Sequence, residues 1–196
     1  MARDLLGRYL VRRLPLEGGE TGGARLVLRL VETEAYLGAP DRASHAWAGR
    51  RTARNESLYL PGGHAYVYFI YGMHFCLNAV TGRADVGSAV LLRAGEPVEG
   101  VERMAMNRRW TRAPRPGDLA GGPGKLCQAL AIDRALDGVR LDLRTGELAI
   151  TEGEPAAPEE VAEGPRIGVD YAGEHAAWPL RFALRGNRHV SRPWMG

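Results

Sequence analysis

The segment RLVETEAY, residues 29–36, is more informative than any other part of this chain. Read as a β-strand with a side-chain period of two, it continues an apolar face into a polar one. The residues on that common face are Leu26, Leu28, Leu30, Glu32, Glu34 and Tyr36. Because burying a carboxylate is costly unless it is paired or protonated, acids on an apolar face indicate a candidate reaction centre. The alternative is structural, with both glutamates paired to arginines at the rim of a sheet.

The size and composition of the whole chain predict one folded domain, residues 1–196. The chain is 45% hydrophobic and 25% charged, a composition that suits a packed core and argues against disorder. No uninterrupted apolar run approaches the roughly 18 residues of a membrane span. The first residues, MARDLLGRYL, are charged every few positions, unlike a secretion signal. We therefore expect a cytoplasmic protein that makes no contact with a membrane.

The charged residues permit a nucleic-acid partner without requiring one. The net charge is +3, and Lys125 is the single lysine among 26 basic residues. Arginine, which supplies the rest, binds phosphate bidentately. The two cysteines, Cys76 and Cys127, lie far apart in apolar surroundings, which is typical of core packing. The sequence contains no His/Cys motif with zinc or iron–sulfur spacing, so we expect no metal and no cofactor.

The first third of the chain predicts a hairpin followed by a long loop. Residues 9–15 and 25–36 read as antiparallel strands joined through a glycine-rich turn at 18–23. Residues 37–54 show no periodicity, and a loop of that length is usually functional. His45 lies in its middle beside Trp47, and the alternative there is a surface histidine next to a packing tryptophan. Asn55 reads as the N-cap of a short helix through Leu60.

The run HAYVYFIYGMHFCLNAV, residues 64–80, is the most β-prone of the chain and predicts a second hairpin. If Tyr71 pairs with His74 across a two-residue turn, Tyr68 comes within one position of Asn78 on the other strand. Tyr71 and Met73 would then occupy the tip. Exposed apolar side chains there indicate insertion into a partner, unless the tip folds back on its own domain.

The remaining elements follow from shorter patterns. The strand 87–97 is apolar up to Arg93, which we expect to pair with Glu32 or Glu34. Helices are predicted from residue 99 to 110 and from Gly122-Pro-Gly onward, with Lys125 in the first turn, where backbone N–H groups attract anions. Beyond residue 133 we expect a hairpin at 136–151, an acidic loop at 154–165 and strands within 165–176 and 178–187.

Taken together, these segments resemble the alkyladenine (3-methyladenine) DNA glycosylases over nearly the whole chain. The matching motifs, in order, are VETEAYLG at 31–38, D-x-x-S-H at 41–45, Arg54-Asn55, YVYFIYGMHFCLN at 66–78, VLLRA at 90–94, GPGKLCQALAI at 122–132 and RIGV-x-x-AGE at 166–174. An ordered series of this kind is far more specific than one short signature. The resemblance implies an α+β fold: one mixed domain around a curved antiparallel sheet, with surrounding helices and a protruding hairpin that enters the DNA minor groove.

The resemblance also implies roles for individual residues. Glu34 matches the catalytic base, and Arg93 matches the partner that holds this glutamate and its water. The flipped base would lie among Tyr36, His45 and Tyr68, with Asn78 excluding guanine. Tyr71 matches the residue that fills the gap left by the base, with Met73 beside it, and Arg54 and Lys125 would contact the DNA backbone. His74 departs from the tyrosine of some relatives, which puts the grip of the hairpin on DNA in question.

The implied activity is a monofunctional one, acting on double-stranded DNA that contains alkylated or deaminated purines. A single glutamate without a lysine nucleophile predicts hydrolysis of the glycosidic bond to leave an abasic site. We expect a monomer without metal or cofactor. Two alternatives remain open at this point: a non-catalytic nucleic-acid-binding module of the same fold, and a hydrolase of free nucleosides.

Overall fold

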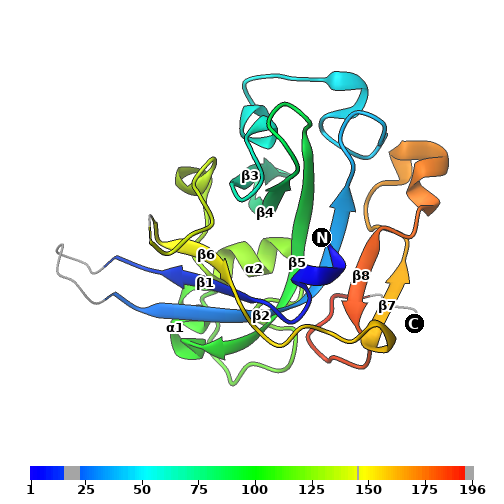
Figure 1. The fold of residues 1–196 in the computed structure, drawn as a ribbon. Helices are drawn as coiled ribbons and strands as arrows, with labels where there is room; N and C mark the ends of the chain where they lie inside the picture. The colour runs from blue at the N-terminus through cyan, green and yellow to red at the C-terminus, as the bar shows by residue number, and fades with distance from the viewer. Residues whose placement is uncertain (16–22, 145, 193–196) are drawn as a thin grey trace.

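The computed structural model describes residues 1–15, 23–144 and 146–192. The described part of the chain forms an eight-stranded antiparallel sheet with two short α-helices, so the α+β prediction is confirmed (Figure 1). The strands are β1 (Tyr9–Arg13), β2 (Arg25–Tyr36), β3 (Ala65–Ile70), β4 (His74–Thr81), β5 (Ser88–Glu99), β6 (Leu148–Thr151), β7 (Val161–Gly164) and β8 (Arg181–Leu184). The helices are α1 (Val101–Asn107) and α2 (Pro123–Ala129).

Short 3-10 helices connect these elements: Arg3–Leu5, Trp47–Gly49, Glu56–Tyr59, Arg134–Leu136, Pro158–Glu160 and Asp170–Ala177. The strand order is β3-β4-β5-β2-β1-β6, and β8 pairs with both β2 and β7. On one edge of β2, residues 25–29 pair with β1, and residues 32–34 pair with β8. Strand β2 thus exchanges one partner for another along its length. Figure 1 shows the result, with the β1–β2 arm extending to one side and β7–β8 standing on the other.

Two offset bulges interrupt the ladder between β2 and β5. Leu30 pairs with Gly95 and Glu32 with Ala94, so Val31 is an extra residue on β2. Thr33 then pairs with Leu92, so Arg93 is an extra residue on β5. Bulges re-aim side chains and are enriched beside active sites. Because neighbouring residues of β5 point to opposite faces, Glu32 is turned to the face opposite that of Leu30. The prediction that the glutamates share the leucine face is therefore wrong, because the period of two does not hold across Val31.

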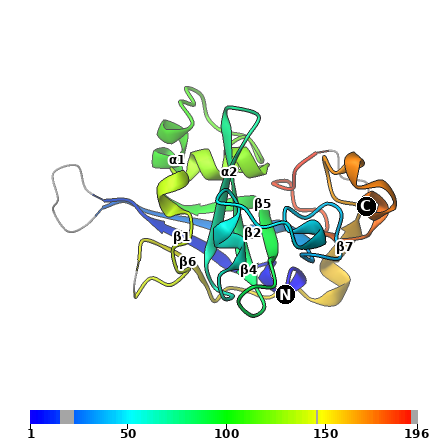
Figure 2. The same ribbon diagram turned by 90° about the horizontal axis from the view of Figure 1, so that it is seen from above.

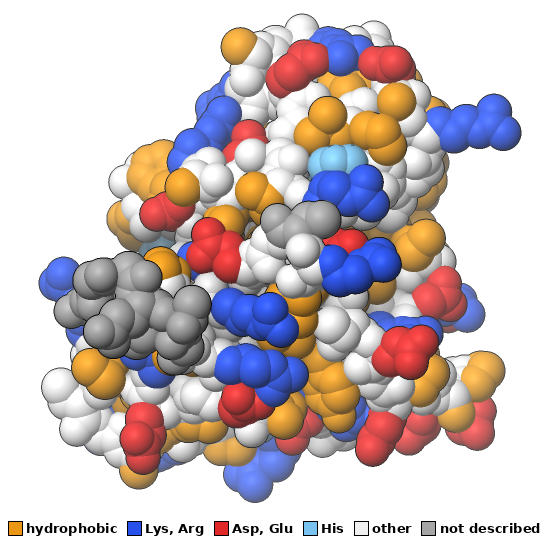
Figure 3. Space-filling model, turned by 60° about the vertical axis from the view of Figure 1, so that its left-hand side comes forward, with side chains coloured by type: hydrophobic (Ala, Val, Ile, Leu, Met, Phe, Trp, Pro, Cys, Tyr) orange, Lys and Arg blue, Asp and Glu red, His pale blue; other side chains and the backbone are white. Residues whose placement is uncertain are grey.

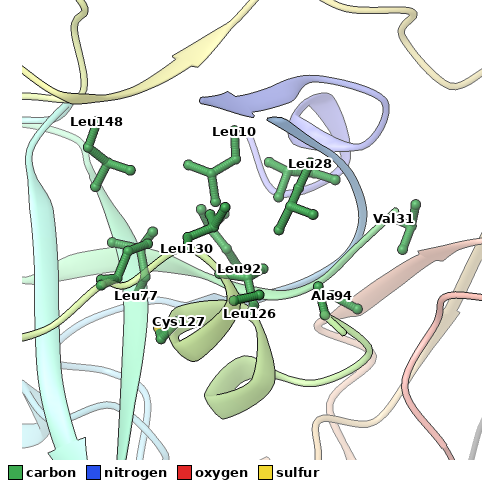
Figure 4. Close-up of a cluster of buried hydrophobic side chains, with 14 of the residues drawn as sticks. Leu10, Leu28, Val31, Leu77, Leu92, Ala94, Leu126, Cys127, Leu130 and Leu148 are labelled. Carbon is green, nitrogen blue, oxygen red and sulfur yellow. The ribbon is translucent and has the colours of Figure 1, made fainter. Parts of the chain in front are cut away.

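The main core lies between the sheet and the helices. Helix α2 packs against β4 and β5 and contacts α1, and Figure 2 shows the two helices together along one side of β2 and β5. In Figure 4 the α2 side chains Leu126 and Cys127, and Leu130 directly after the helix, lie beside Leu77 and Leu92, and all five are buried. Burying one leucine side chain contributes about 1.5–3 kcal/mol. This packing holds β4 and β5, the strands that form one wall of the site.

Several predicted elements are confirmed and others are corrected. The 9–36 hairpin is present, although its predicted turn falls almost entirely outside the described residues. In the second hairpin Ile70, and not Tyr71, pairs with His74, around a three-residue turn, so Tyr68 pairs with Cys76, two positions from Asn78, and Tyr66 pairs with Asn78 itself. The predicted hairpin at 136–151 is wrong because β6 pairs with β1.

Three further corrections concern the last third of the chain and the loop before the second hairpin. The predicted acidic loop contains β7, and residues 170–177 form a 3-10 helix where a strand was expected. The helix after Asn55 is present, but the Asn55 side chain does not cap it. Instead, Asn55 bonds back into the loop, accepting from Thr52 N at 2.7 Å and donating to the carbonyls of His45 and Arg50 at 3.0 Å each.

The surface carries both signs of charge. On the face shown in Figure 3, Lys and Arg side chains are interspersed with Asp and Glu, in keeping with the small net charge. Among the described residues, no helix has the length and apolar character needed to cross a lipid bilayer.

Candidate active site

Glu32 is a structural anchor at the point where the sheet changes partner. Its side chain is fully buried and accepts bonds from Arg93 Nε at 3.1 Å and Arg181 Nε at 2.6 Å. The backbone N–H and the hydroxyl of Ser191 donate to it at 2.7 and 2.9 Å. A buried carboxylate surrounded by donors in this way ties β2, β5, β8 and the C-terminal segment together. The alternative interpretation, in which an acid of this strand pairs with arginines and only supports the structure, therefore applies to Glu32.

Glu34 is equally buried and is held by three groups from three segments. Its Oε1 accepts from the backbone N–H of Ile167 at 2.8 Å and lies 3.2 Å from Arg93 Nη1, and its Oε2 accepts from the Tyr36 hydroxyl at 2.9 Å. Burial raises the pKa of Glu34 above its usual value, against the opposing effects of Arg93, Ile167 and Tyr36. A carboxyl with a raised pKa is suited to take up a proton near neutral pH. The predicted pairing of Arg93 with a β2 glutamate is confirmed for both acids.

Tyr36 is held on its other side by a cation. The guanidinium carbon of Arg166 lies 4.8 Å from the centre of the Tyr36 ring. Burial and the adjacent Glu34 raise the pKa of Tyr36 well above its usual value, so its hydroxyl keeps its proton and donates it. Arg166 also forms a fully buried ion pair with Asp41, at 2.5 and 2.9 Å.

The three partners of Glu34 line a cavity of about 1040 Å³. This volume is at the upper end of the roughly 300–1,000 Å³ typical of small-molecule sites. Glu34 itself is not exposed in the cavity and lies behind Tyr36, Arg93 and Ile167. The structure brings nearly all the other predicted site residues to this cavity: Tyr36, His45, Arg54, Tyr68, Tyr71, Asn78, Arg93 and Lys125. The exception is Met73, which is 68% exposed at the hairpin turn and does not line the cavity.

One wall is aromatic and comes from the loop and from β3. The His45 and Tyr68 rings meet edge to face with centroids 4.6 Å apart, and His45 Nδ1 lies 2.7 Å from the Tyr66 hydroxyl. Partial burial lowers the pKa of His45, and the nearby arginines lower it further, so its ring is neutral at pH 7. On β4, Asn78 is held in place by donating from Nδ2 to the Tyr66 carbonyl at 3.1 Å. The wall is therefore rigid and uncharged.

The rim of the cavity carries the predicted DNA-contacting residues. Tyr71 is 78% exposed at the tip of the β3–β4 hairpin and has a positive φ of 54°. Arg54 donates from Nη2 to the Phe69 carbonyl at 2.7 Å, which ties the long loop to the hairpin. Across the cavity, Lys125 donates to the Gly117 carbonyl at 3.3 Å. A Cβ on Gly124 would lie 3.0 Å from the His74 ring, so the start of α2 rests against the hairpin.

Sequence reasoning missed three contributions to this site. Ile167 acts through its backbone N–H, which no side-chain pattern reveals, although the RIGV motif at 166–169 had marked the segment. Tyr66 fixes both His45 and Asn78. Cys76, expected in core packing, is buried but also lines the cavity, whereas Cys127 lies in the main core. Among the described residues there is no group of three or more His, Cys, Asp or Glu that could hold a metal ion.

Comparison with known proteins gives one consistent result. The family model described as "Methylpurine-DNA glycosylase (MPG)" matches residues 1–188. The human protein named DNA-3-methyladenine glycosylase is 45% identical over 199 residues, covering 97% of this chain and 63% of the human one. A relative from Methanocella arvoryzae, provisionally named a 3-methyladenine DNA glycosylase, is 50% identical over 98% of this chain and 90% of its own length. A relative from Myxococcus xanthus with the same provisional name is 47% identical, over 98% of this chain and 87% of its own length. The chain therefore belongs to the methylpurine-DNA glycosylase family.

Proposed function

We propose that this monofunctional DNA glycosylase extrudes an alkylated purine from duplex DNA into the cavity and hydrolyses its glycosidic bond with a water activated by Glu34. The observation that carries the proposal is the placement of Glu34. It is the buried carboxyl with a raised pKa, and all three groups that hold it line a cavity of purine-binding size and character. Glu32, two residues earlier, is bound instead by Arg93, Arg181 and Ser191, which suits a structural role.

The walls of the cavity suit a flat, electron-poor base. Tyr36, His45 and Tyr68 present three rings to one space, and stacking on aromatic side chains contributes about 1–3 kcal/mol per base. Because His45 is neutral, it does not repel a cationic purine. Asn78, fixed by its bond to the Tyr66 carbonyl, would meet the exocyclic amine of guanine and disfavour the unmodified base. 7-Methylguanine carries the same amine, so its excision depends on the weak glycosidic bond of its cationic ring.

The chemical step needs one base and no acid when the purine is already cationic. The water oxygen bonds to the anomeric carbon, one of its protons passes to Glu34, and the glycosidic electron pair leaves on the purine nitrogen, which becomes neutral. An ionised Glu34 also stabilises the oxocarbenium-like sugar. Oε2 accepts one bond, from Tyr36, so a second lone pair remains for the water, which reaches it only when one of the shielding groups Tyr36, Arg93 and Ile167 shifts.

The charge on the purine determines how readily it is excised. 3-Methyladenine and 7-methylguanine carry a positive charge on the ring and leave readily. Hypoxanthine and ethenoadenine are neutral and need a proton from a donor. We therefore expect the two methylated purines to be excised faster than the two neutral lesions.

The rim fits the handling of duplex DNA. An exposed Tyr71 at the hairpin tip would fill the gap in the stack, with Met73 beside it, because apolar wedges of this kind hold an opened duplex. Arg54 and Lys125 lie where the backbone of the extruded strand would run. We further propose that residues 1–196 act as one domain and as a monomer, in the compartment that holds the chromosomal DNA.

The test is incubation of the protein with duplex DNA that contains 7-methylguanine, followed by alkali. Abasic sites break under alkali, so strand breaks that require the protein support the proposal. The Glu34→Gln variant should bind the same duplex and form no breaks, whereas Glu102→Gln, an exchange at an exposed glutamate of α1, should match the unmodified protein. Binding without breaks would favour the non-catalytic module. Release of base from free nucleosides, with none from duplex DNA, would favour the nucleoside hydrolase.

A further inference from the structure

The ion pair between Asp41 and Arg166 has no part in the chemistry described so far, yet it is the most enclosed ion pair near the cavity. Both side chains are fully buried, and two nitrogens of Arg166 bond the two oxygens of Asp41, at 2.5 and 2.9 Å. Burial alone would raise the pKa of Asp41, but Arg166 and the backbone N–H groups of Leu37 and Ala43 outweigh it and hold that pKa below its usual value. Asp41 is therefore charged at neutral pH, and both of its oxygens and both terminal nitrogens of Arg166 are hydrogen-bonded, whereas the buried Arg166 Nε has no partner.

The same pair joins three segments that each supply part of the site. Arg166 donates to the Ala35 carbonyl at 2.9 Å and to the His175 carbonyl at 3.2 Å, which reaches the end of β2 and the last 3-10 helix. Asp41 accepts from the backbone N–H of Leu37 at 3.1 Å and of Ala43 at 3.0 Å, which shapes the loop that leads to His45.

Both residues that touch Glu34 from this side depend on Arg166. Tyr36, which donates to Oε2, has the guanidinium stacked on its ring at 4.8 Å. Ile167, which donates to Oε1, is the next residue after Arg166. A guanidinium held at four acceptors has little freedom, so it fixes the backbone of Ile167 and the plane of the Tyr36 ring together.

We propose that Asp41 and Arg166 are a positioning pair that keeps the Tyr36 hydroxyl and the Ile167 N–H directed at Glu34, which sets the protonation equilibrium of the general base. The inference rests on the proposed catalytic role of Glu34. Neither Asp41 nor Arg166 touches the substrate or the reacting atoms; they act through Tyr36 and Ile167. Loss of the pair would weaken two bonds that favour the ionised carboxylate.

Of the other charged and titratable groups described near Glu34, Tyr36 is the one that contacts the pair. The groups come from β2, β3, β4, β5 and the 166–177 segment, and are Glu32, Tyr36, Tyr68, Cys76, Arg93 and Tyr171. Arg93, the nearest cation, pairs with Glu32 and Glu34 and belongs to a separate ion-pair cluster. A change in the pH dependence of the Arg166 variant therefore reports on the pair.

The experiment measures the rate of single-turnover excision of 7-methylguanine as a function of pH. This cationic purine leaves without help from an acid. The fall in rate at low pH, called the acidic limb here, therefore reports on the protonation of Glu34. Arg166→Lys keeps the charge, but one ammonium cannot serve four acceptors in the plane of a guanidinium. We expect a loss of at least about tenfold in rate below neutral pH, recovered as the pH rises, because the acidic limb moves to higher pH. Asp41→Asn keeps the volume of the side chain and removes the partner of Arg166, so it should also move the limb, but by less, because the unbalanced charge of Arg166 opposes the upward shift.

Controls separate this inference from the proposed function. Arg144→Lys makes the same exchange in a surface pair with Asp142 and should leave rate and limb unchanged. The double variant Asp41→Asn/Arg166→Lys should be no slower than the slower single variant. A folded Arg166→Lys or Asp41→Asn protein with an unmoved limb overturns the positioning role, and so does failure of both to fold, which would make the pair a stability element. If Glu34→Gln excises normally, the proposed function itself is wrong, whatever the pair does.

Discussion

Removing the Tyr36 hydroxyl should make excision more sensitive to acid without disturbing the cavity. In Tyr36→Phe the ring remains, and with it the contact to Arg166 at 4.8 Å. The one bond lost is the donation to Glu34 Oε2 at 2.9 Å. The reactive form of Glu34 is the ionised one, and its pKa is already raised by burial. Loss of a donor to the carboxylate raises it further, so activity disappears at the acidic end of the range first.

The size of the effect follows from the environment of this bond. A hydrogen bond to a charged group contributes about 1.5–3 kcal/mol, and about 1.4 kcal/mol is tenfold in an equilibrium constant. The acceptor is fully buried, so water does not replace the lost donor. We therefore expect the proton affinity of Glu34 to rise about ten- to a hundredfold. Below the acidic limb the excision rate should fall by a similar factor, and well above it the rate should return to that of the unmodified protein.

The assay is single-turnover release of 7-methylguanine from duplex DNA across the acidic and neutral range. The matched control is Tyr68→Phe, which removes the hydroxyl of a second tyrosine that lines the cavity. That hydroxyl bonds to Cys76 and not to Glu34. Tyr68→Phe should leave the acidic limb in place. A uniform loss of rate at every pH in Tyr36→Phe, or an equal shift of the limb in both variants, would refute the reasoning.

Two further predictions concern the hairpin and the core. Tyr71→Ala should weaken binding of a lesion duplex far more than binding of the same lesion in single-stranded DNA, because only the duplex has a gap to fill; equal losses on both, measured by fluorescence anisotropy, would argue against a wedge. Leu126→Ala empties a fully buried position of α2 and should cost about 2–5 kcal/mol in urea unfolding. Met106→Ala, at a 67% exposed position of α1, should cost less than about 0.5 kcal/mol, and a similar loss in both would contradict the core assignment.

The parts of the site that could be predicted from sequence are those set by side-chain identity and short-range period. Strand β2 has the predicted bounds of 25–36, and its charge pattern correctly indicated a partnership with Arg93. The β3–β4 hairpin follows from its aromatic and β-branched residues. Its register was misassigned because the turn between Ile70 and His74 contains three residues where two were expected.

The parts that could not be predicted depend on long-range pairing or on the backbone. The bulges at Val31 and Arg93 reverse which face the glutamates occupy, and no local pattern announces an extra residue in a ladder. The bond from Ile167 comes from a main-chain N–H, so residue identity carries no signal for it. The late strands were misread because short segments such as β6 and β7 pair with distant partners, β1 and β8.

The change of partner along β2 has a consequence for how the protein matures on the ribosome. The groups that bind Glu32 include Arg181 and Ser191, and Glu34 accepts a bond from Ile167, so the late-synthesised part of the chain completes the site. The chain leaves the ribosome N-terminus first, so β1, β2 and β5 emerge before these partners do. A nascent chain can thus bury the leucines of β1, β2 and β5 while both acids still lack these partners. Truncation products that stop before residue 166 should be inert toward DNA lesions, and premature stop codons late in the gene should abolish activity.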